Sequence, residues 1–417
     1  MAIKGFGEEK TVGQVIENSV LDSNNYGINH NMNDSIETFN IDDQIDDVSN
    51  DASQKNVIND INNFINYYDT EDLALASLKG IENPIDVSDL PGGYRFQGFT
   101  YTDNYIYITA YDHKKNSHES SVVLVYDHKG NYLGKMFLPK GAGGDSHVGG
   151  VSFDSKHNIL YITGKNGDVL ALNNKLVEET IKSYSDISND TFDFSMDDYD
   201  HFRIEDFVIN NQDINLLNSI PKEIQDYLST TGDNLNAASV YYDETNQKLY
   251  VPTFSANSKV YVFDVEFDSD GKPTYKYDKI YGINEATNSK VDDVELPPGI
   301  QGVSIYTDNK GEQYLLTASS FGSNDSVIVK YKVNEDGSLS FSGQKVLEGI
   351  KGAENMMIDG KKIYFNVEND VSGSHHQDGG TFYSFDIEKD IIGSIDDKDY
   401  QHAIKKLSSS ASDYDNR

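Results

Sequence analysis

Five segments of this chain repeat one pattern, and this repetition constrains the fold more than any other feature of the sequence. Each segment opens with small or polar residues, continues as an apolar run, passes an Asp/Asn turn and closes with an aromatic and aliphatic run. The segments are Phe96–Thr109, Val148–Thr163, Ala237–Thr253, Ile300–Thr317 and Ala353–Val367. Apolar runs of this length, bounded by turn residues, indicate two β-strands in each segment.

A third strand-like run follows each repeat, and five such units predict the architecture. These runs are Val122–Asp127, Asp168–Leu172, Val260–Asp264, Val327–Val333 and Thr381–Asp386. Repeats of roughly 40–50 residues built from short strands are typical of β-propeller blades. The sequence therefore predicts an all-β, five-bladed β-propeller. An irregular β-sandwich stays open as the alternative.

The longest gap between repeats contains an insertion, residues 174–234, with helix-like stretches at Lys175–Tyr184 and Pro221–Leu228. A distorted sixth blade within the insertion stays open. We place the propeller at residues 81–400. Residues 1–80 are rich in Asn, Asp, Ile and Ser and predict a helical or partly disordered segment, with helix-like stretches at Thr11–Val20 and Asn56–Leu78. Residues 401–417 are predicted to be a flexible tail.

The composition excludes several classes of function. The chain has 34 basic and 69 acidic residues and a net charge of −35, which disfavours nucleic acid as a partner and favours divalent cations. Without cysteine it has no disulfide, thiolate metal site or cysteine nucleophile. No apolar run approaches the length of a membrane span, and the N-terminus lacks the apolar segment of a classical signal peptide.

The long polar segments are predicted to share one face of the propeller. In an up-and-down blade, the segment that enters the first strand and the loop that follows the second strand lie on the same face, and the short turns between these strands lie on the other. The long segments of the first kind are Tyr111–Ser121, Lys140–His147, the insertion, Ser319–Ser326 and Glu368–Gly380. Because sites are commonly built on loops of a rigid scaffold, we expect the functional site on this rim.

The densest acidic cluster of the rim lies in the insertion and predicts a calcium site, since Ca²⁺ takes six to eight oxygen ligands from such carboxylates. As metal ligands we assign Asp145, Asp197, Asp200 and Glu205. As catalytic groups that would hold or move protons we assign Asp198, His147 and His201. Further candidates on the rim are His375, His376 and Asp378. A solvated acidic loop is the alternative interpretation.

The central channel offers a second candidate site. The second positions of the repeats are Gln97, Gly149, Ala238, Gln301 and Glu354, and Asn236 stands two residues before one of them. Gln97, Asn236, Gln301 and Glu354 could therefore meet in the channel. The alternative is that these side chains pair with backbone groups around it.

The repeated pattern resembles the SMP-30/lactonase-like and NHL-like propellers over residues 91–395. In lactonase-like propellers, carboxylate and amide groups at the starts of the inner strands hold a metal ion in the funnel. The resemblance implies a metal-dependent hydrolase with its metal at Glu354. Only Glu354 is acidic among the five aligned positions, and this departs from the family's metal pattern.

The chain also resembles LXG-type antibacterial toxins exported by type VII systems. It combines a leaderless start, a helical N-terminal piece, no cysteine and an acidic propeller with an Asp-rich insertion, as in the lipid II phosphatases of that class. Tyr67–Glu71 and Tyr68–Asp72 match the Tyr-x-x-x-Asp/Glu export signal. The resemblance implies secretion from a Gram-positive bacterium without a classical signal peptide, and an immunity protein as partner. It also implies calcium-dependent hydrolysis of a polyprenyl-linked cell-wall precursor such as lipid II.

A non-catalytic propeller is the remaining hypothesis. Such a protein would present its loop face to glycans or proteins, and the Tyr-rich loops would supply stacking surfaces. An adhesin of this kind would tolerate the replacement of a single rim aspartate, whereas an enzyme would not.

Overall fold

The computed structural model describes residues 94–112, 121–138, 148–164, 168–187, 192–194, 207–209, 214–231, 237–282, 295–368 and 381–415, together with the pairs 2–3, 10–11 and 74–75. The chain divides into two units, Met1–Ala74 and Leu75–Arg417. In the first unit, β1 (Ala2–Ile3) pairs antiparallel with β2 (Lys10–Thr11). The described residues of 1–80 form only short strands. Most of the two predicted helices lies outside the described residues. At Ala74–Leu75, where we predicted helix, the chain forms strand β3.

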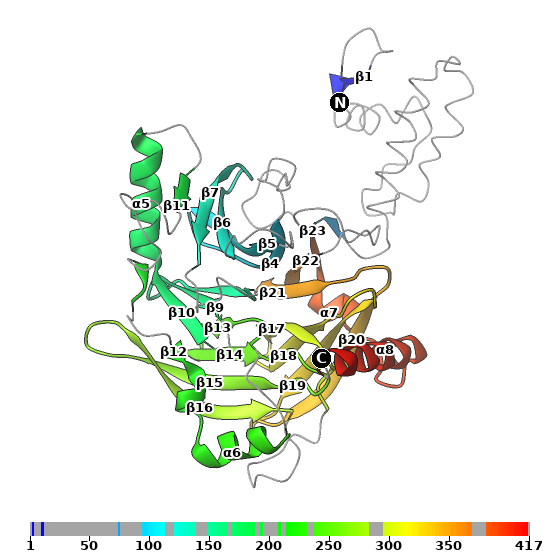
Figure 1. The fold of residues 1–417 in the computed structure, drawn as a ribbon. Helices are drawn as coiled ribbons and strands as arrows, with labels where there is room; N and C mark the ends of the chain where they lie inside the picture. Colours follow the sequence, from blue (N-terminus) through cyan, green and yellow to red (C-terminus); the bar gives the residue numbers. More distant parts are fainter. Residues whose placement is uncertain are drawn as a thin grey trace, which may run out of the picture. The chain divides into compact units, whose positions relative to one another are not determined.

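The second unit contains five small sheets, which confirms the five-bladed propeller (Figure 1). Blade one contains β4 (Tyr94–Tyr101), β5 (Tyr105–Asp112), β6 (Val122–Asp127) and β7 (Tyr132–Phe137). Blade two contains β8 (Val151–Asp154), β9 (Ile159–Thr163) and β10 (Asp168–Asn173). Blade three contains β13 (Tyr241–Asp243), β14 (Lys248–Pro252), β15 (Val260–Phe267) and β16 (Pro273–Tyr281).

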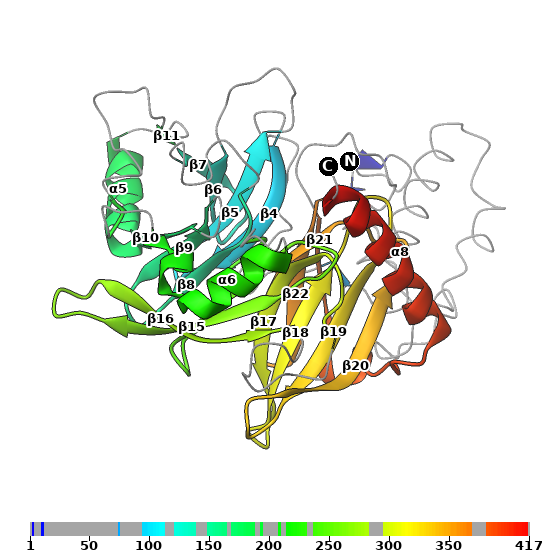
Figure 2. The same ribbon diagram turned by 60° about the horizontal axis from the view of Figure 1, so that its bottom comes forward.

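Blades four and five complete the ring. Blade four contains β17 (Ile300–Thr307), β18 (Gln313–Ser319), β19 (Ser326–Val333) and β20 (Leu339–Leu347). Blade five contains β21 (Ala353–Asp359), β22 (Lys362–Val367) and β23 (Thr381–Asp386), with β3 as its fourth strand. The innermost strands β4, β8, β13, β17 and β21 contact one another in turn, and β21 contacts β4 to close the circle (Figure 2). Separate apolar clusters fill the seams between neighbouring blades.

The strand registers place the loops as the sequence predicted. Tyr94 at the start of β4 pairs with Asp112 at the end of β5, and Asp359 pairs with Lys362 across the turn at the opposite end of blade five. The starts of the first strands and the ends of the second strands therefore share one face, which we call the rim face. The short turns lie on the other face, the turn face.

The inner strands approach one another so closely that they need small residues. A Cβ atom on Gly150 would lie 2.1 Å from Ser239 Oγ, and one on Gly302 would lie 2.4 Å from the Glu354 carbonyl oxygen. The space that remains at the axis is crossed by Asn355, which is 2 % exposed.

The amide of Asn355 joins blade five to three other blades. Its nitrogen donates to the carbonyl oxygens of Phe99 in blade one (3.3 Å) and Val151 in blade two (3.2 Å). Its oxygen accepts from Ser239 Oγ, at the start of blade three (3.0 Å). One side chain thus spans the centre of the ring.

The insertion contributes to existing blades and forms no sixth blade among its described residues. It begins with α5 (Asn174–Ile187), continues through β11 (Phe192–Phe194) and β12 (Ile214–Asn215), and ends with η4 (Leu216–Ser219) and α6 (Lys222–Thr231). Both predicted helices are confirmed. β11 adds to the edge of β7 and β12 adds to β10, because edge strands offer unpaired backbone groups.

The start of the insertion corrects one expectation. We predicted that the insertion belongs to the rim face, but α5 starts on the turn face, because β10 runs away from the rim before the helix begins. Val177 and Ile181 of α5 pack into the core between blades one and two. Ile224 and Leu228 of α6 do the same between blades two and three.

The predicted flexible tail is wrong for residues 401–415. This segment belongs to helix α8 (Lys398–Asp415), which lies across the outer strands β19 and β20 of blade four (Figure 2). Tyr400, Ala403 and Leu407, at helical spacing, are buried in the core between blades three and four. Burial of this apolar stripe stabilises the helix. A short helix, α7 (Ile387–Asp390), follows β23. None of the described helices is long and apolar enough to cross a membrane.

Replacement of Asn355 by alanine should destabilise the propeller by about 2 kcal/mol or more, because it leaves buried polar groups of three other blades without their partner. Urea denaturation would measure the loss. Asn334→Ala is the matched control: its amide bonds to Ser338 and Ser340 in a surface hairpin, and we expect a change within roughly 0.5 kcal/mol. Equal losses in both variants would contradict the role of Asn355.

Leu407→Ala should lower the free energy of unfolding by about 2–5 kcal/mol, the usual cost of truncating a buried leucine. The side chain of Leu407 lies on the inner side of α8 and is fully buried. Lys405→Ala, on the exposed side of the same helix, should be nearly neutral. Thermal unfolding of both variants would measure the effects. An unchanged stability of Leu407→Ala would show that the segment is a flexible tail.

Candidate functional site

Three of the four predicted channel residues lie in β-bulges at the rim end of neighbouring inner strands. The register shifts between Phe96 and Gly98 in β4, between Ile300 and Gly302 in β17, and between Ala353 and Met356 in β21. The residues within these irregularities include Gln97, Gln301 and Glu354. A bulge changes the direction of a side chain without ending the strand, and bulges are frequent next to active sites. Asn236 lies outside the described residues.

The two glutamines do not have the same surroundings. Gln97 is buried, and its amide nitrogen donates to the carbonyl oxygen of Phe96 at 3.0 Å. This is the backbone pairing that we gave as the alternative interpretation of the channel residues. Gln301 is half-buried. Neither glutamine carries a charge, so acid–base chemistry at this end of the inner strands depends on Glu354.

Glu354 is a buried carboxyl group in an unfavourable environment for charge. It is 3 % exposed and makes no hydrogen bond to another described residue. Burial raises the pKa of Glu354 well above its usual range, and the nearby charge of Glu368 raises it further. The raised pKa favours the neutral form of Glu354, which can donate a proton.

Glu368 lies beside Glu354 in a contrasting environment. It follows β22 directly, and its carboxylate accepts a hydrogen bond from Arg95 Nη1 at 3.2 Å and a short one from the Tyr111 hydroxyl. Arg95 and Glu368 side chains are 16 % and 18 % exposed, so both reach solvent. Arg95 and Tyr111 thus hold the Glu368 carboxyl group in place.

Arg95 and Tyr111 are held in place by their own strands. They face each other across the β4–β5 pair of blade one. Burial lowers the pKa of Arg95, but Tyr111 and Glu368 outweigh this and leave it raised. Burial, with Glu368, raises the pKa of Tyr111, so its hydroxyl keeps its proton and remains a donor. We call Arg95, Tyr111, Glu354 and Glu368 the seam cluster, since blades one and five meet there.

The seam cluster does not fit a calcium ion. Arg95 already occupies one oxygen of Glu368 with a positive charge, and among the described residues the cluster contains two carboxyl groups, Glu354 and Glu368. Ca²⁺ needs six to eight oxygens. Among the described residues no group of three or more His, Asp and Glu side chains could hold a metal. The metal that the lactonase resemblance implies at Glu354 is therefore not supported by this donor set.

The predicted rim centre lies outside the described residues. This applies to the assigned ligands and to the catalytic and further rim candidates: Asp145, His147, Asp197, Asp198, Asp200, His201, Glu205, His375, His376 and Asp378. The calcium site on the insertion stays a prediction.

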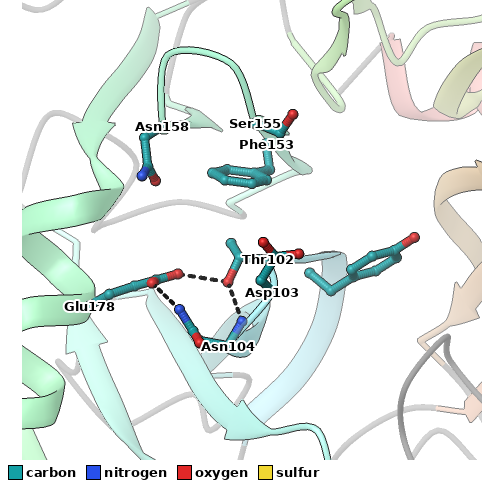
Figure 3. A pocket seen from close by; sticks show the side chains of 8 residues that line it. Thr102, Asp103, Asn104, Phe153, Ser155, Asn158 and Glu178 are labelled. Atoms are coloured by element: carbon teal, nitrogen blue, oxygen red, sulfur yellow. Dashed lines mark hydrogen bonds between the residues drawn. The ribbon is translucent and has the colours of Figure 1, made fainter.

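A pocket of about 240 Å³ opens on the turn face, away from the seam cluster (Figure 3). Its only carboxylate from a helix, Glu178 of α5, accepts hydrogen bonds from Thr102 Oγ1 (2.7 Å) and Asn104 Nδ2 (2.6 Å). Both partners belong to the first turn of blade one. Glu178 thus has a structural role in holding α5 against blade one, and the pocket lacks a carboxyl group comparable to Glu354.

Comparisons with known proteins show no family for this chain. No family model matches, and no curated protein matches. Solved structures with some similarity include a protein of Bacteroides uniformis provisionally named 6-phosphogluconolactonase, at 14 % identity and a TM-score of 0.30, over 64 % of this chain and 59 % of the other. The periplasmic gluconolactonase of Pseudomonas aeruginosa matches at 11 % identity and a TM-score of 0.32, over 71 % and 70 %.

A Bacteroides thetaiotaomicron protein of unknown function matches at 10 % identity and a TM-score of 0.34, over 75 % of each chain. The chain spans less than two thirds of the length of the Bacteroides uniformis protein. Similarities this low say nothing about activity, and the propeller is established by the strand pairing of the chain itself. None of these comparisons supports the resemblance to LXG toxins.

Sequence reasoning named Glu354 but did not join it to its neighbours. Arg95 and Glu368 are 273 residues apart and belong to the first and the last blade. In a closed ring the first and last blades are neighbours. The sequence could therefore have predicted that polar residues at the start of β4 lie close to those at the end of β22. Tyr111, near the end of β5, and Glu368, directly after β22, stand at equivalent places in their blades, which is the signal that was missed.

The raised pKa of Glu354 predicts how stability depends on pH. As pH rises above the ordinary carboxyl range, the unfolded chain releases this proton before the folded protein does, so Glu354 destabilises the fold progressively. Glu354→Gln removes that effect. Its melting temperature should differ little from wild type near pH 4 and exceed it by pH 8.

The matched control is Glu388→Gln. Glu388 bonds to Lys361 and to the Tyr306 hydroxyl (2.6 Å), and these partners lower its pKa. Its stabilisation is present above the ordinary carboxyl range and lost on acidification, so this variant should melt lower than wild type at pH 8. Parallel pH–melting curves for the two variants would refute the assignment of a neutral Glu354.

Proposed function

We propose that this chain is a hydrolase of small carboxylic esters or lactones, and that it works by acid–base catalysis at the seam cluster. The observation that carries the proposal is the contrast between two neighbouring carboxyl groups. Glu354 is buried without a hydrogen bond to any described residue, and Glu368 is held by Arg95 and Tyr111. Pairs of carboxyl groups whose environments push their protonation states apart are typical of acid–base sites.

The two groups divide the reaction between them. Glu368, as carboxylate, accepts a proton from a water molecule whose oxygen attacks the carbonyl carbon of the substrate. Glu354, as acid, donates its proton to the oxygen of the leaving alcohol when the carbon–oxygen bond breaks. One water is consumed, and one acid and one alcohol are formed, which are parts of the same molecule if the substrate is a lactone. Arg95 and Tyr111 orient Glu368.

The exposure of the cluster suits this division. Arg95 and Glu368 reach solvent at the rim face, where a substrate would arrive, whereas Glu354 lies deeper and is shielded from water. Burial raises the pKa of Glu354 and so favours its protonated form before each turnover.

The hypotheses of a lipid II phosphatase and of a binding module rest on rim residues outside the described part of the chain. Calcium, a lipid-linked precursor, an immunity protein and secretion stay predictions of the sequence. Nothing at the seam cluster requires them.

Hydrolysis of a panel of small esters and lactones, followed by proton release in a pH-stat, would test the proposal. Glu354→Gln and Glu368→Gln should each lower kcat by about 100-fold or more, the usual contribution of a general acid or base. Glu388→Gln should retain wild-type activity, since it changes a carboxylate with the same kinds of partner, a tyrosine and a cation, on the turn face. Absence of turnover on the whole panel would favour the binding-module hypothesis.

A further inference from the structure

Asn366 is a buried amide that the protein itself does not satisfy. It lies in β22, is fully buried, and neither its Nδ2 nor its Oδ1 has a hydrogen-bond partner. Among the described residues it is the only side chain with two such atoms. A buried polar group without a partner costs about 1–3 kcal/mol, so a fully unused amide in a core strand calls for an explanation.

The register of blade five places Asn366 in the seam with blade one. Asn366 pairs with Phe382 of β23, so the two side chains share one face of the sheet. The Phe382 ring contacts the rings of Phe96 (5.9 Å) and Phe99 (5.1 Å) in blade one. Asn366 therefore faces blade one.

The same face leads to the seam cluster. Side chains two residues apart in an extended strand point in the same direction, so Asn366 lies beneath Glu368, one step deeper in the seam. Across the β21–β22 pair, Ala353 is opposite Val367 and Met356 is opposite Phe365. Asn366 is thus opposite the bulge that contains Glu354. The amide lies next to both carboxyl groups of the proposed site.

Thr109 is the residue of blade one that is equivalent to Asn366, and its hydrogen bond shows how a polar side chain at this position can serve the packing of the blades. Thr109 stands two residues before Tyr111, as Asn366 stands two residues before Glu368. The Thr109 hydroxyl donates to the carbonyl oxygen of Gly149 on the next inner strand at 2.6 Å. In blade two, Thr163 donates in the same way to Gly150 within its own blade at 3.2 Å. Asn366 makes no comparable bond, so its polarity serves something other than blade packing.

We infer that Asn366 is a positioning residue that binds the water molecule from which Glu368, as base, takes a proton. This inference rests on the proposed function. The amide oxygen of Asn366 would accept one hydrogen of that water and the Glu368 carboxylate the other. The water oxygen is then left to form the bond to the substrate carbon, while its proton passes to Glu368. The Cα atoms of residues two apart in a strand are about 6–7 Å from each other, and side chains that lean together from these positions can be bridged by one water.

The first test is a high-resolution crystal structure of the full-length wild-type protein. We expect one ordered water within hydrogen-bond distance of the Asn366 amide and the Glu368 carboxylate. Its presence does not depend on turnover, so this test separates the inference from the proposed function. A seam without density between the two side chains would overturn the inference even if the protein hydrolyses esters.

The second test is Asn366→Thr, which places the residue of blades one and two in blade five. The variant should fold with an equal or higher melting temperature, because it removes an unsatisfied buried amide. Its kcat should fall about 10- to 100-fold with KM unchanged, since the substrate binds as before and only the water is displaced. Asn334→Thr, in the surface hairpin, is the control and should change neither.

The outcomes are distinct. Wild-type kcat in folded Asn366→Thr would overturn the positioning role, and so would a loss expressed only in KM. If the variant does not fold, the wild-type water structure decides alone. If the water is present and no ester is hydrolysed, the proposed function fails and the water site stands.

Discussion

The hydrogen bonds of Asn355 across the axis set the geometry on which the rest of the molecule depends. Four of the five blades can be joined through one amide only if the inner strands come very close together, and this requires glycine or serine where they meet. A fully buried amide with three partners in three other blades fixes the ring more specifically than apolar contacts, which tolerate sliding. The same side chain closes the channel at its own level. Glu354 therefore lies on the rim side of the level at which Asn355 fills the axis.

Because Asn355 fills the axis, the candidate site lies at a seam between two blades and not on the axis itself. The seam between blades one and five is the one in which Arg95, Glu354 and Glu368 come together. A buried acid and an unsatisfied amide both reduce stability, and proteins tend to retain such costs at functional sites. Neither Glu354 nor Asn366 contributes to the packing of blade five in the way that Thr109 contributes to blade one.

The strands of the propeller were largely predictable, because each repeat carries its own hydrophobic pattern and turn residues. Val122–Asp127 and Thr381–Asp386 were predicted to the residue as strands. The tail was not, although Tyr400, Ala403, Leu407 and Ala411 follow helical spacing; the charged and serine-rich residues between them suggested a solvated chain. The position of β12 in blade two was also beyond the sequence, since pairing with an exposed edge leaves no local signal. For the site, the alignment of the repeats identified Glu354. The partners of the neighbouring Glu368, Arg95 and Tyr111, belong to the first blade and are far from it in the sequence.

Two similar clusters at opposite ends of the blades show why the seam is the better candidate. Glu368 with Tyr111 and Arg95 on the rim face has a counterpart in Glu388 with Tyr306 and Lys361 on the turn face. A carboxylate bonded to a tyrosine and a cation is by itself an ordinary structural pair. What distinguishes the rim cluster is its second carboxyl group, whose pKa is raised by burial, and the unsatisfied amide of Asn366 beneath it. Acid–base chemistry needs a donor and an acceptor of protons at the same time, and the rim cluster provides two carboxyl groups in different environments for these roles.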